Sequence, residues 1–151
     1  MTTRDKAARH TGGLEEAAFL DLLRTAEMLS HPLAQLFKSQ ELSMTQYNVL
    51  RILRGAPEGL TCGEVGTRMI TRDPDITRLL DRLEKRRLIE RARDAKDRRV
   101  VLTRIAPAGL ELLAALDDPV QQTHLRSLGH LGPERLGQLR DLLAVCRARL
   151  G

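Results

Sequence analysis

Arginine and lysine side chains are concentrated in one part of the chain, where they share a common chemistry. Residues 72–104, called here the basic segment, contain twelve Lys or Arg and seven Asp or Glu, whereas the other residues include thirteen of each. The whole net charge of +5 therefore belongs to this segment. Such a balance favours a polyanion as partner, either nucleic acid or an anionic membrane surface. A membrane-surface helix needs a long amphipathic face with aromatic anchors, and the basic segment has neither, so we prefer nucleic acid.

Residues that could bind a metal or catalyse a reaction follow no recognised pattern. The cysteines, Cys62 and Cys146, are too few and too isolated for a disulfide framework or a zinc cluster. The histidines show no pairing at i and i+4, the spacing that a metal site on a helix would use: His10, His31, His124 and His130. The sequence has no glycine-rich phosphate loop, nucleophile elbow or paired catalytic carboxylates. We therefore expect no metal, no cofactor and no enzymatic activity.

The composition limits the fold class. Apolar residues make up 42% of the 151 residues, with only two Phe, one Tyr and no Trp. The core must therefore be aliphatic, which favours helices over a sheet sandwich. A chain of this length forms one domain or one tightly built unit. Because no apolar run has the length of a membrane span and no signal peptide opens the chain, we expect a soluble intracellular protein.

Two short helices with strong start signals precede the basic segment. Ser43–Gln46 and Thr61–Glu64 both fit the capping box, in which the cap hydroxyl and the side chain at N3 satisfy backbone amides reciprocally. A Leu precedes each box and can contact the residue at N4. The turn Gly55–Gly59 separates the two predicted helices.

A third helix is predicted after Asp73 and Pro74, which suit the cap and the first helical position. Asp75 adds negative charge at the positive end of the helix dipole. One face of this helix is apolar, with Ile76, Leu79, Leu80 and Leu83. The other face carries Asp75, Thr77, Arg78, Asp81, Arg82 and Lys85. A helix, a short turn and a second helix with a basic outer face are typical of a helix-turn-helix.

A hairpin is predicted next, with strands at Leu88–Arg93 and Arg98–Ile105. The polar turn Asp94–Asp97 joins them. A basic hairpin directly after a helix-turn-helix indicates a wing, so we predict a winged helix-turn-helix over residues 39–106.

The flanking segments are predicted to be helical, after a mobile arm at residues 1–12. One helix runs from Leu14 to about Phe37, and Pro32 should bend or interrupt it. Another runs from about Pro107 to Leu128. The last carries a seam with 3, 4, 3, 4 spacing, formed by Leu136, Leu139, Leu143, Cys146 and Leu150.

These seams could pack within one chain, but apolar seams left over at both ends favour a symmetric dimer. We therefore assign residues 13–38 and 107–151 to a helical dimerisation region. The predicted fold is mainly α with a small β-hairpin wing, a winged helix-turn-helix domain flanked by N- and C-terminal dimerisation helices.

Several runs in this arrangement resemble the multiple-antibiotic-resistance regulator (MarR) family. They are Leu42–Leu53, Leu60–Met69, Ile76–Lys85 and the Asp97-Arg98-Arg99 of the hairpin. The similarity spans about residues 40–110, and the terminal helices agree by pattern only. The resemblance implies a transcriptional regulator of the bacterial cytoplasm and nucleoid. Such a protein would be a homodimeric repressor that binds palindromic operator DNA and is released by a small-molecule effector.

The resemblance also implies roles for single residues. The second helix of the helix-turn-helix would lie in the major groove, with Thr77, Arg78 and Arg82 as base and phosphate contacts. Asp75 lies at the start of the same surface and is grouped with the DNA-binding residues.

In the wing, Arg98 or Arg99 would contact the minor groove of an A·T-rich stretch. Asp81 would pair with Arg99 and fix the angle between helix and wing. For Arg82 and Arg99 an intramolecular role remains an equal alternative, because exposed ion pairs contribute little energy but can still orient side chains.

The sequence departs from the family pattern at three places. Arg87 stands where the family usually has Gly, so the turn before the wing could be reshaped. Ala106 replaces the usual Thr before the next helix, which removes a cap worth about 1 kcal/mol. The first helix has no close motif match.

An effector cleft is the remaining expectation from the resemblance. Family members often bind small anionic aromatic compounds between the dimerisation helices and the winged domain, and the candidate lining is Met28, Phe37, Met44, Tyr47 and Arg51. Ordinary core packing is the stronger interpretation of these residues. We expect Cys62 to be structural and Cys146 to be packed in the seam. A winged helix that docks an acidic protein partner remains the alternative to DNA binding.

Overall fold

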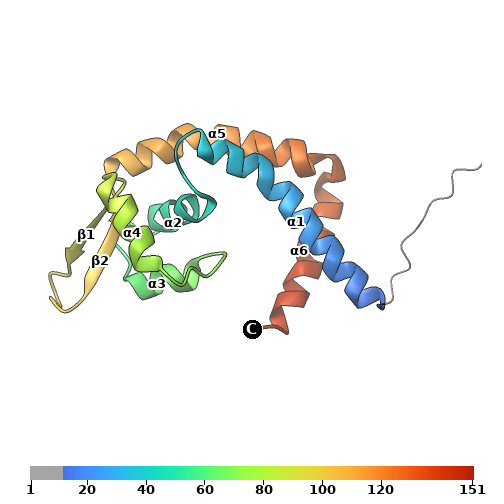
Figure 1. The fold of residues 1–151 in the computed structure, drawn as a ribbon, viewed down its shortest axis with the longest axis horizontal. Coiled ribbons are helices and arrows are strands. Elements are labelled where there is room, and N and C mark those ends of the chain that lie inside the picture. Colours follow the sequence, from blue (N-terminus) through green and yellow to red (C-terminus); the bar gives the residue numbers. More distant parts are fainter. Residues whose placement is uncertain (1–11) are drawn as a thin grey trace, which may run out of the picture.

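The computed structural model describes residues 12–151, which form a mainly helical chain with one small hairpin (Figure 1). The predicted fold class is confirmed. The elements are α1 (Leu14–Lys38), α2 (Met44–Arg54), α3 (Cys62–Arg68), α4 (Ile76–Lys85), β1 (Ile89–Arg93), β2 (Val101–Ile105), α5 (Pro107–Leu128), the 3₁₀ turn η1 (Gly129–Leu131) and α6 (Gly132–Ala148). The arm predicted at residues 1–12 lies outside the described residues, apart from Gly12.

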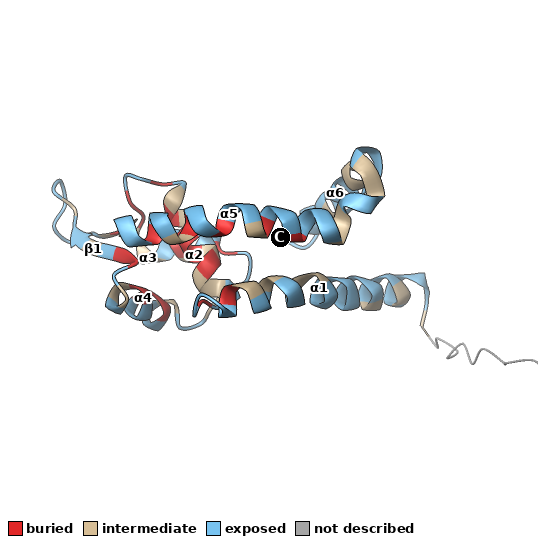
Figure 2. Ribbon diagram, turned by 90° about the horizontal axis from the view of Figure 1, so that it is seen from above, coloured by how far each residue is buried: buried red, intermediate tan, exposed pale blue. Residues whose placement is uncertain are grey.

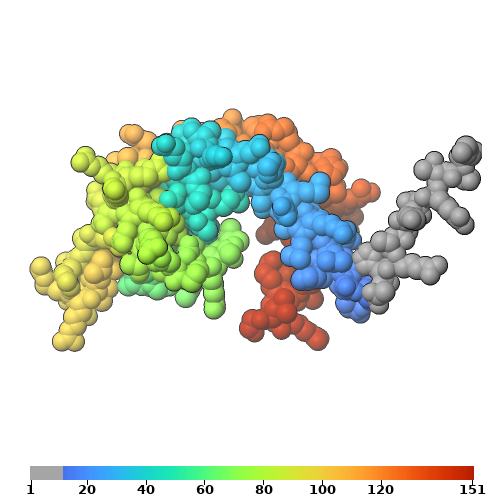
Figure 3. All heavy atoms as spheres, viewed as in Figure 1, coloured from blue at the N-terminus to red at the C-terminus, as the bar shows by residue number. Residues whose placement is uncertain are grey.

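The chain forms an arch, in which α5 spans the length between two ends (Figure 1). One end carries α2, α3, α4 and the hairpin, and the other carries the first part of α1 together with α6. The space-filling view shows the hairpin projecting from the molecule and a broad hollow beneath the arch (Figure 3). No described helix is long and apolar enough to cross a membrane.

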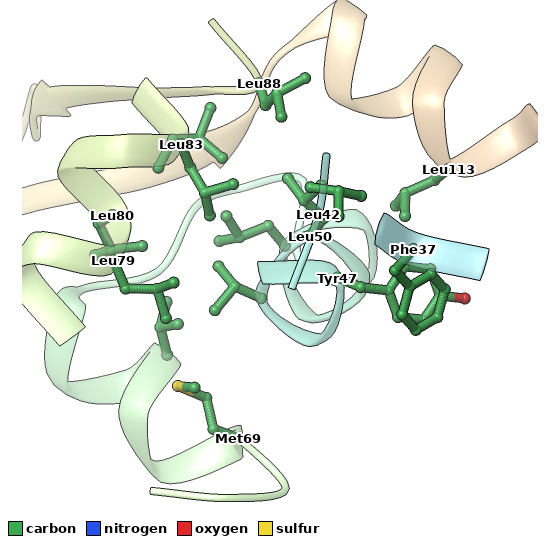
Figure 4. Packing of buried hydrophobic residues seen from close by; sticks show 14 of the residues in the cluster. Phe37, Leu42, Tyr47, Leu50, Met69, Leu79, Leu80, Leu83, Leu88 and Leu113 are labelled. Atoms are coloured by element: carbon green, nitrogen blue, oxygen red, sulfur yellow. The ribbon is translucent and has the colours of Figure 1, made fainter. Parts of the chain in front are cut away.

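The hydrophobic core lies at the end that carries the hairpin, where buried residues gather in Figure 2. Helix α4 contributes Leu79, Leu80 and Leu83 to this core, as its predicted apolar face indicated (Figure 4). The core extends beyond the 39–106 segment, because Phe37 of α1 and Leu113 of α5 are fully buried in it. The winged unit therefore packs on both flanking helices, and its division into separate domains stays a prediction.

Both predicted capping boxes are present. The Gln46 amide N–H donates to Ser43 Oγ at 3.1 Å, and the Ser43 N–H donates to Gln46 Oε1 at 3.0 Å. Thr61 and Glu64 repeat the pattern at 3.2 and 2.8 Å. The backbone N–H and the hydroxyl of Thr61 both donate to Glu64 Oε2, at 2.8 and 3.0 Å, and these two hydrogen bonds lower the pKa of the Glu64 carboxyl. Capping depends on residues three apart, which explains why the sequence predicted it correctly.

The cap of α4 differs from the prediction. Asp75, not Asp73, is the N-cap, and its Oδ1 accepts the backbone N–H of Arg78 at 3.3 Å. Asp73 instead accepts the Asp75 N–H at 2.8 Å, which closes a turn containing Pro74 before the helix begins. The preference of Asp for turns outweighed its preference for the cap at this position.

The hairpin pairs β1 with β2 in antiparallel register, from Ile89 opposite Ile105 to Arg93 opposite Val101. The second strand is shorter than predicted because the chain at 94–100 turns, with the Asp94 N–H donating to the Val100 carbonyl at 2.8 Å. A further bridge was not predicted. Leu60, before α3, pairs with Thr103 through backbone hydrogen bonds of 3.0 and 2.7 Å. This bridge connects the wing to the helix-turn-helix.

Two departures from the family pattern have definite structural outcomes. Arg87 has φ +59°, so it keeps the left-handed conformation that favours glycine, and the turn is not reshaped. The Leu88 N–H donates to the Leu83 carbonyl and the Arg87 N–H to the Glu84 carbonyl, which together form a Schellman motif. Ala106 is the N-cap of α5 and provides no side-chain hydrogen bond, as expected.

Helix α1 continues through Pro32, so the interruption that was one of the two predicted outcomes is absent. In the middle of a helix, proline removes one backbone hydrogen bond without necessarily ending the helix. The predicted seam of α6 is only partly covered within the chain, since Leu136 and Leu143 are half-buried while Leu139 and Cys146 are exposed. Cys146 is thus not packed within the single chain, and its packing in a dimer seam stays a prediction.

Candidate nucleic-acid interface

Helix α4 has one buried and one exposed side, as a helix that docks into a groove requires. The buried side rests on the core through Leu79, Leu80 and Leu83. On the other side Thr77, Arg78 and Arg82 are all exposed. A helix of this width fits the major groove, and guanidinium groups match the O6 and N7 acceptors of guanine.

Arg78 is paired with the residue that caps its own helix. Its Nε lies 3.2 Å from Oδ2 of Asp75, and both side chains are more than half exposed. Asp75 therefore belongs to the same surface as the predicted base contacts. Among the described residues, the side chain of Arg82 forms no ion pair.

The predicted ion pair between Asp81 and Arg99 is wrong, because Asp81 pairs with Arg91. Arg91 also contacts Glu84, with its Nη2 and Nε at 2.6 and 3.1 Å from Oε2. The hydrogen bonds that Arg91 donates to Glu84 raise the pKa of Arg91. Arg91 lies on β1, which packs against α4, whereas Arg99 precedes β2 and donates its backbone N–H to Asp97 Oδ1. Arg91 of β1 therefore forms the ion pair between helix and wing that was expected of Arg99.

The turn of the wing exposes Arg98 and Arg99. Within residues 12–151 neither guanidinium forms an ion pair or a side-chain hydrogen bond. Arg93 donates from Nη1 to the carbonyl of Arg98 at 2.7 Å, which holds the backbone of the turn. The two predicted wing arginines are thus available to an external anion.

Other arginines of the basic segment have internal roles that the sequence did not reveal. Arg86 donates to the carbonyls of Glu41 and Gln40 at 2.6 and 3.2 Å and so ties the end of α4 to the turn after α1. Arg91 links β1 to α4. The free cationic surface is therefore smaller than the charge count of the segment indicates.

The start of α2 extends the exposed surface of α4. A polar hollow of about 490 Å³ lies between them, lined by Ser43, Thr45, Gln46, Asp73, Asp75, Arg78, Leu79 and Arg82. Sequence reasoning assigned Ser43 and Gln46 only to capping. Nothing in their spacing showed that the turn before α2 would lie beside α4.

A second hollow, called here the α2–α5 cleft, lies on the far side of α2 and has a volume of about 420 Å³. Tyr47 and Arg51, both predicted effector residues, line it with Arg54, Asp117, Val120, Gln121, His124, Leu125, Leu128, Gly129 and Leu136. Phe37 stacks behind Tyr47, with ring centroids 4.0 Å apart. Met28 lines a different hollow on α1, and Met44 lines neither. The structure thus brings together only part of the predicted effector set.

An ion pair closes one side of the α2–α5 cleft. Arg54 contacts Asp117 through two hydrogen bonds of 2.9 and 3.0 Å, and these lower the pKa of the Asp117 carboxyl. Burial raises the pKa of Tyr47. The cleft therefore combines an apolar wall with two guanidinium groups and one carboxylate already engaged by Arg54.

Exposed apolar side chains mark the end of the arch opposite the wing. Helix α1 exposes Leu14, Phe19, Leu22, Leu23 and Met28, and the α6 end exposes Leu139, Leu142, Val145 and Leu150. Cys146 lies among the latter, while Cys62 is half-buried at the start of α3. The described residues contain no group of His, Cys, Asp and Glu that could hold a metal.

Comparisons with known proteins agree with this geometry. The family model that matches residues 40–100 is described as the MarR family. A crystal structure of a MarR transcription factor from Planctomyces limnophilus is 39% identical, covers 90% of this chain and 99% of its own, and has a TM-score of 0.67. The HTH-type transcriptional repressor IacR of Pseudomonas putida is 25% identical over 87% of this chain and 78% of its own. BpsR of Bordetella bronchiseptica, solved in a study of how 6-hydroxynicotinic acid regulates its DNA binding, shares the fold. Its TM-score is 0.80 at 22% identity, over 91% of this chain and 98% of its own.

Proposed function

Because this chain belongs to the MarR family of transcriptional regulators, we propose that it binds a palindromic DNA operator as a homodimer. Each α4 lies in a major groove, and each wing lies over the neighbouring minor groove. The protein acts in the cytoplasm on chromosomal DNA. The family is one of transcription regulators, so a non-enzymatic function follows from membership.

The observation that carries the proposal is the set of arginines left exposed on α4 and the wing. Arg78 and Arg82 project from α4, and Arg98 and Arg99 from the turn of the hairpin. Arg91 ties the two elements together through Asp81 and Glu84. Two cationic elements held at a fixed angle suit two adjacent grooves of a duplex better than the surface of an irregular acidic protein.

Dimerisation is supported by the apolar side chains exposed on α1 and α6. Val145 and Leu142 are 68% and 66% exposed on α6, and Leu14 and Met28 are 83% and 75% exposed on α1. Apolar surface of this kind is usually covered by a partner. A second copy placed there would present two α4 helices to half-sites about one helical turn apart.

Repression and effector release are further parts of the proposal. The similarity to IacR, which is named as a repressor, supports repression. The α2–α5 cleft supports an effector, because Arg51 and Tyr47 offer charge and an aromatic surface to a small anionic aromatic compound. BpsR, whose DNA binding is regulated by 6-hydroxynicotinic acid, has the same fold.

The test is selection of bound duplexes from a random DNA pool, followed by titration of the recovered sequence with single variants. We expect an inverted repeat, and we expect Arg78→Ala to weaken binding to it about tenfold or more while relaxing base preference at one position. Arg135→Ala is the matched control, because Arg135 is exposed on α6, far from the wing. Recovery of sequences with no inverted repeat would contradict the proposal, and selective binding of an acidic protein instead would favour the alternative of a protein-docking module.

A further inference from the structure

One acidic side chain lies within the surface assigned to DNA and contacts its central arginine. Asp75 accepts the backbone N–H of Arg78 at Oδ1, 3.3 Å away, and its Oδ2 lies 3.2 Å from Arg78 Nε. Asp73 in turn accepts the backbone N–H of Asp75 at 2.8 Å, which fixes the position of Asp75 itself. These contacts form a chain from Asp73 through Asp75 to the guanidinium of Arg78.

The contact through Nε decides which edge of the guanidinium remains free. A guanidinium has five N–H donors in a rigid plane, and a guanine is bound by two of them side by side, at O6 and N7. Because Nε is the guanidinium nitrogen that pairs with Asp75, the edge formed by the two terminal nitrogens is not used by this ion pair. Asp75 therefore restricts the rotation of Arg78 and leaves free the edge that binds guanine.

Capping alone does not account for a carboxylate at this position. Serine, threonine and asparagine cap helices about as well as aspartate and carry no charge. A negative charge on a surface that contacts phosphates opposes binding, and the exposed ion pair adds little to the stability of the free protein. The helix dipole stabilises a carboxylate here only modestly, and its ion pair with Arg78 adds a function that a neutral cap could not provide.

We propose that Asp75 is a positioning residue that orients Arg78 for guanine and so sets base preference. The proposal rests on the proposed function, since it requires that α4 enters the major groove. Loss of the Asp75 carboxylate should change affinity and base discrimination in opposite directions. Removal of the carboxylate should strengthen binding to non-specific DNA while it weakens discrimination at the guanine that Arg78 contacts.

The experiment uses Asp75→Ser, which keeps a capping oxygen and removes the carboxylate. The guanine that Arg78 contacts is located first, by replacing each guanine of the operator in turn with 7-deazaguanine, which lacks the N7 acceptor. At the contacted guanine, the replacement should weaken binding of the unaltered protein but not binding of Arg78→Ala. At that base we expect 7-deazaguanine to cost the unaltered protein about tenfold in affinity and Asp75→Ser less than about threefold. Affinity of Asp75→Ser for a random duplex should be equal or higher.

Glu90→Ser is the control for loss of a negative charge, because Glu90 is exposed on β1 in the same basic segment and does not contact Arg78. Thermal unfolding checks the fold, and Asp75→Asn, which also caps but is neutral, replaces the serine variant if that variant does not fold. An undiminished 7-deazaguanine penalty in the Asp75 variants would overturn the inference, as would the absence of any such guanine. If the unaltered protein binds no palindrome, the proposed function fails instead.

Discussion

Arg91 is the residue on which the geometry of the interface depends most. It bridges Asp81 and Glu84 of α4 from a position on β1, and only 23% of its side chain is exposed. A partly desolvated guanidinium that contacts two carboxylates forms stronger hydrogen bonds than an isolated surface pair. Arg91 therefore fixes the wing relative to α4 and also neutralises negative charge beside the DNA surface.

We predict that Arg91→Ala lowers affinity for the selected palindrome about tenfold or more and destabilises the fold by about 1–3 kcal/mol. The reason is that Asp81 and Glu84 would lose their cation and repel the phosphates. Fluorescence anisotropy gives the affinity and urea unfolding gives the stability. Arg91→Lys should recover only part of the affinity, because an ammonium group cannot reproduce the planar contact. An unchanged affinity for Arg91→Ala would mean that wing orientation does not matter.

The same residue shows where sequence reasoning reaches its limit. The exposure of Thr77, Arg78 and Arg82 follows from helical spacing and was predicted. The choice between Arg91 and Arg99 as the partner of Asp81 depends on which strand packs against α4. That is a property of the tertiary structure, and several arginines of one hairpin satisfy the same local pattern.

Among the elements, the turn between α4 and β1 carries local backbone strain. Arg87 has φ +59° at the C′ position of a Schellman motif, where a side chain costs about 1–2 kcal/mol relative to the right-handed conformation. The motif persists because its hydrogen bonds satisfy the last carbonyls of α4 and direct the chain into β1.

We predict that Arg87→Gly raises the free energy of unfolding by about 0.5–1 kcal/mol, since relief of strain exceeds the greater entropy of glycine in the unfolded chain. Urea unfolding measures the change. Arg87→Ala is the control, because it removes the same charge but keeps the strain, and it should show no such gain. A loss of stability in the glycine variant would contradict this account of the turn.

Element prediction from sequence succeeded where the signals are local. The capping boxes at Ser43 and Thr61 and the bounds of α5 needed only neighbouring residues. The pairing of Leu60 with Thr103 joins segments more than forty residues apart, so no local pattern indicated it. Asp73 was misassigned for a different reason, because aspartate suits both a turn and a cap and only the three-dimensional path of the chain decides between them.

At the scale of the whole molecule, the arch has one end suited to DNA and one end suited to a second copy. The DNA end has a well-packed core, whereas the α1 and α6 end exposes apolar side chains (Figure 2). The sequence predicted this division by its leftover seams. It could not show that Phe37 and Leu113 would join the winged unit to both helices, which depends on how the elements pack.

We predict that Val145→Asp converts a dimer to a monomer at micromolar concentration, because a charge placed in an apolar interface is costly to desolvate. Sedimentation velocity measures the mass. Glu111→Gln is the control. Glu111 is exposed near the start of α5, at the end of the arch that carries the hairpin, so this variant should remain dimeric. If the unaltered protein sediments as a well-folded monomer, the dimer proposal is wrong.

The central claim is that arginines of α4 and the wing contact DNA phosphates and bases, and salt titration of the selected palindrome tests it most directly. We predict that affinity falls about a thousandfold or more between roughly 50 and 200 mM salt. Arg98→Ala should make the slope of log affinity against log salt shallower by about one unit, while Arg135→Ala leaves it unchanged. A slope near zero, or one unaffected by Arg78→Ala and Arg98→Ala together, would contradict the claim.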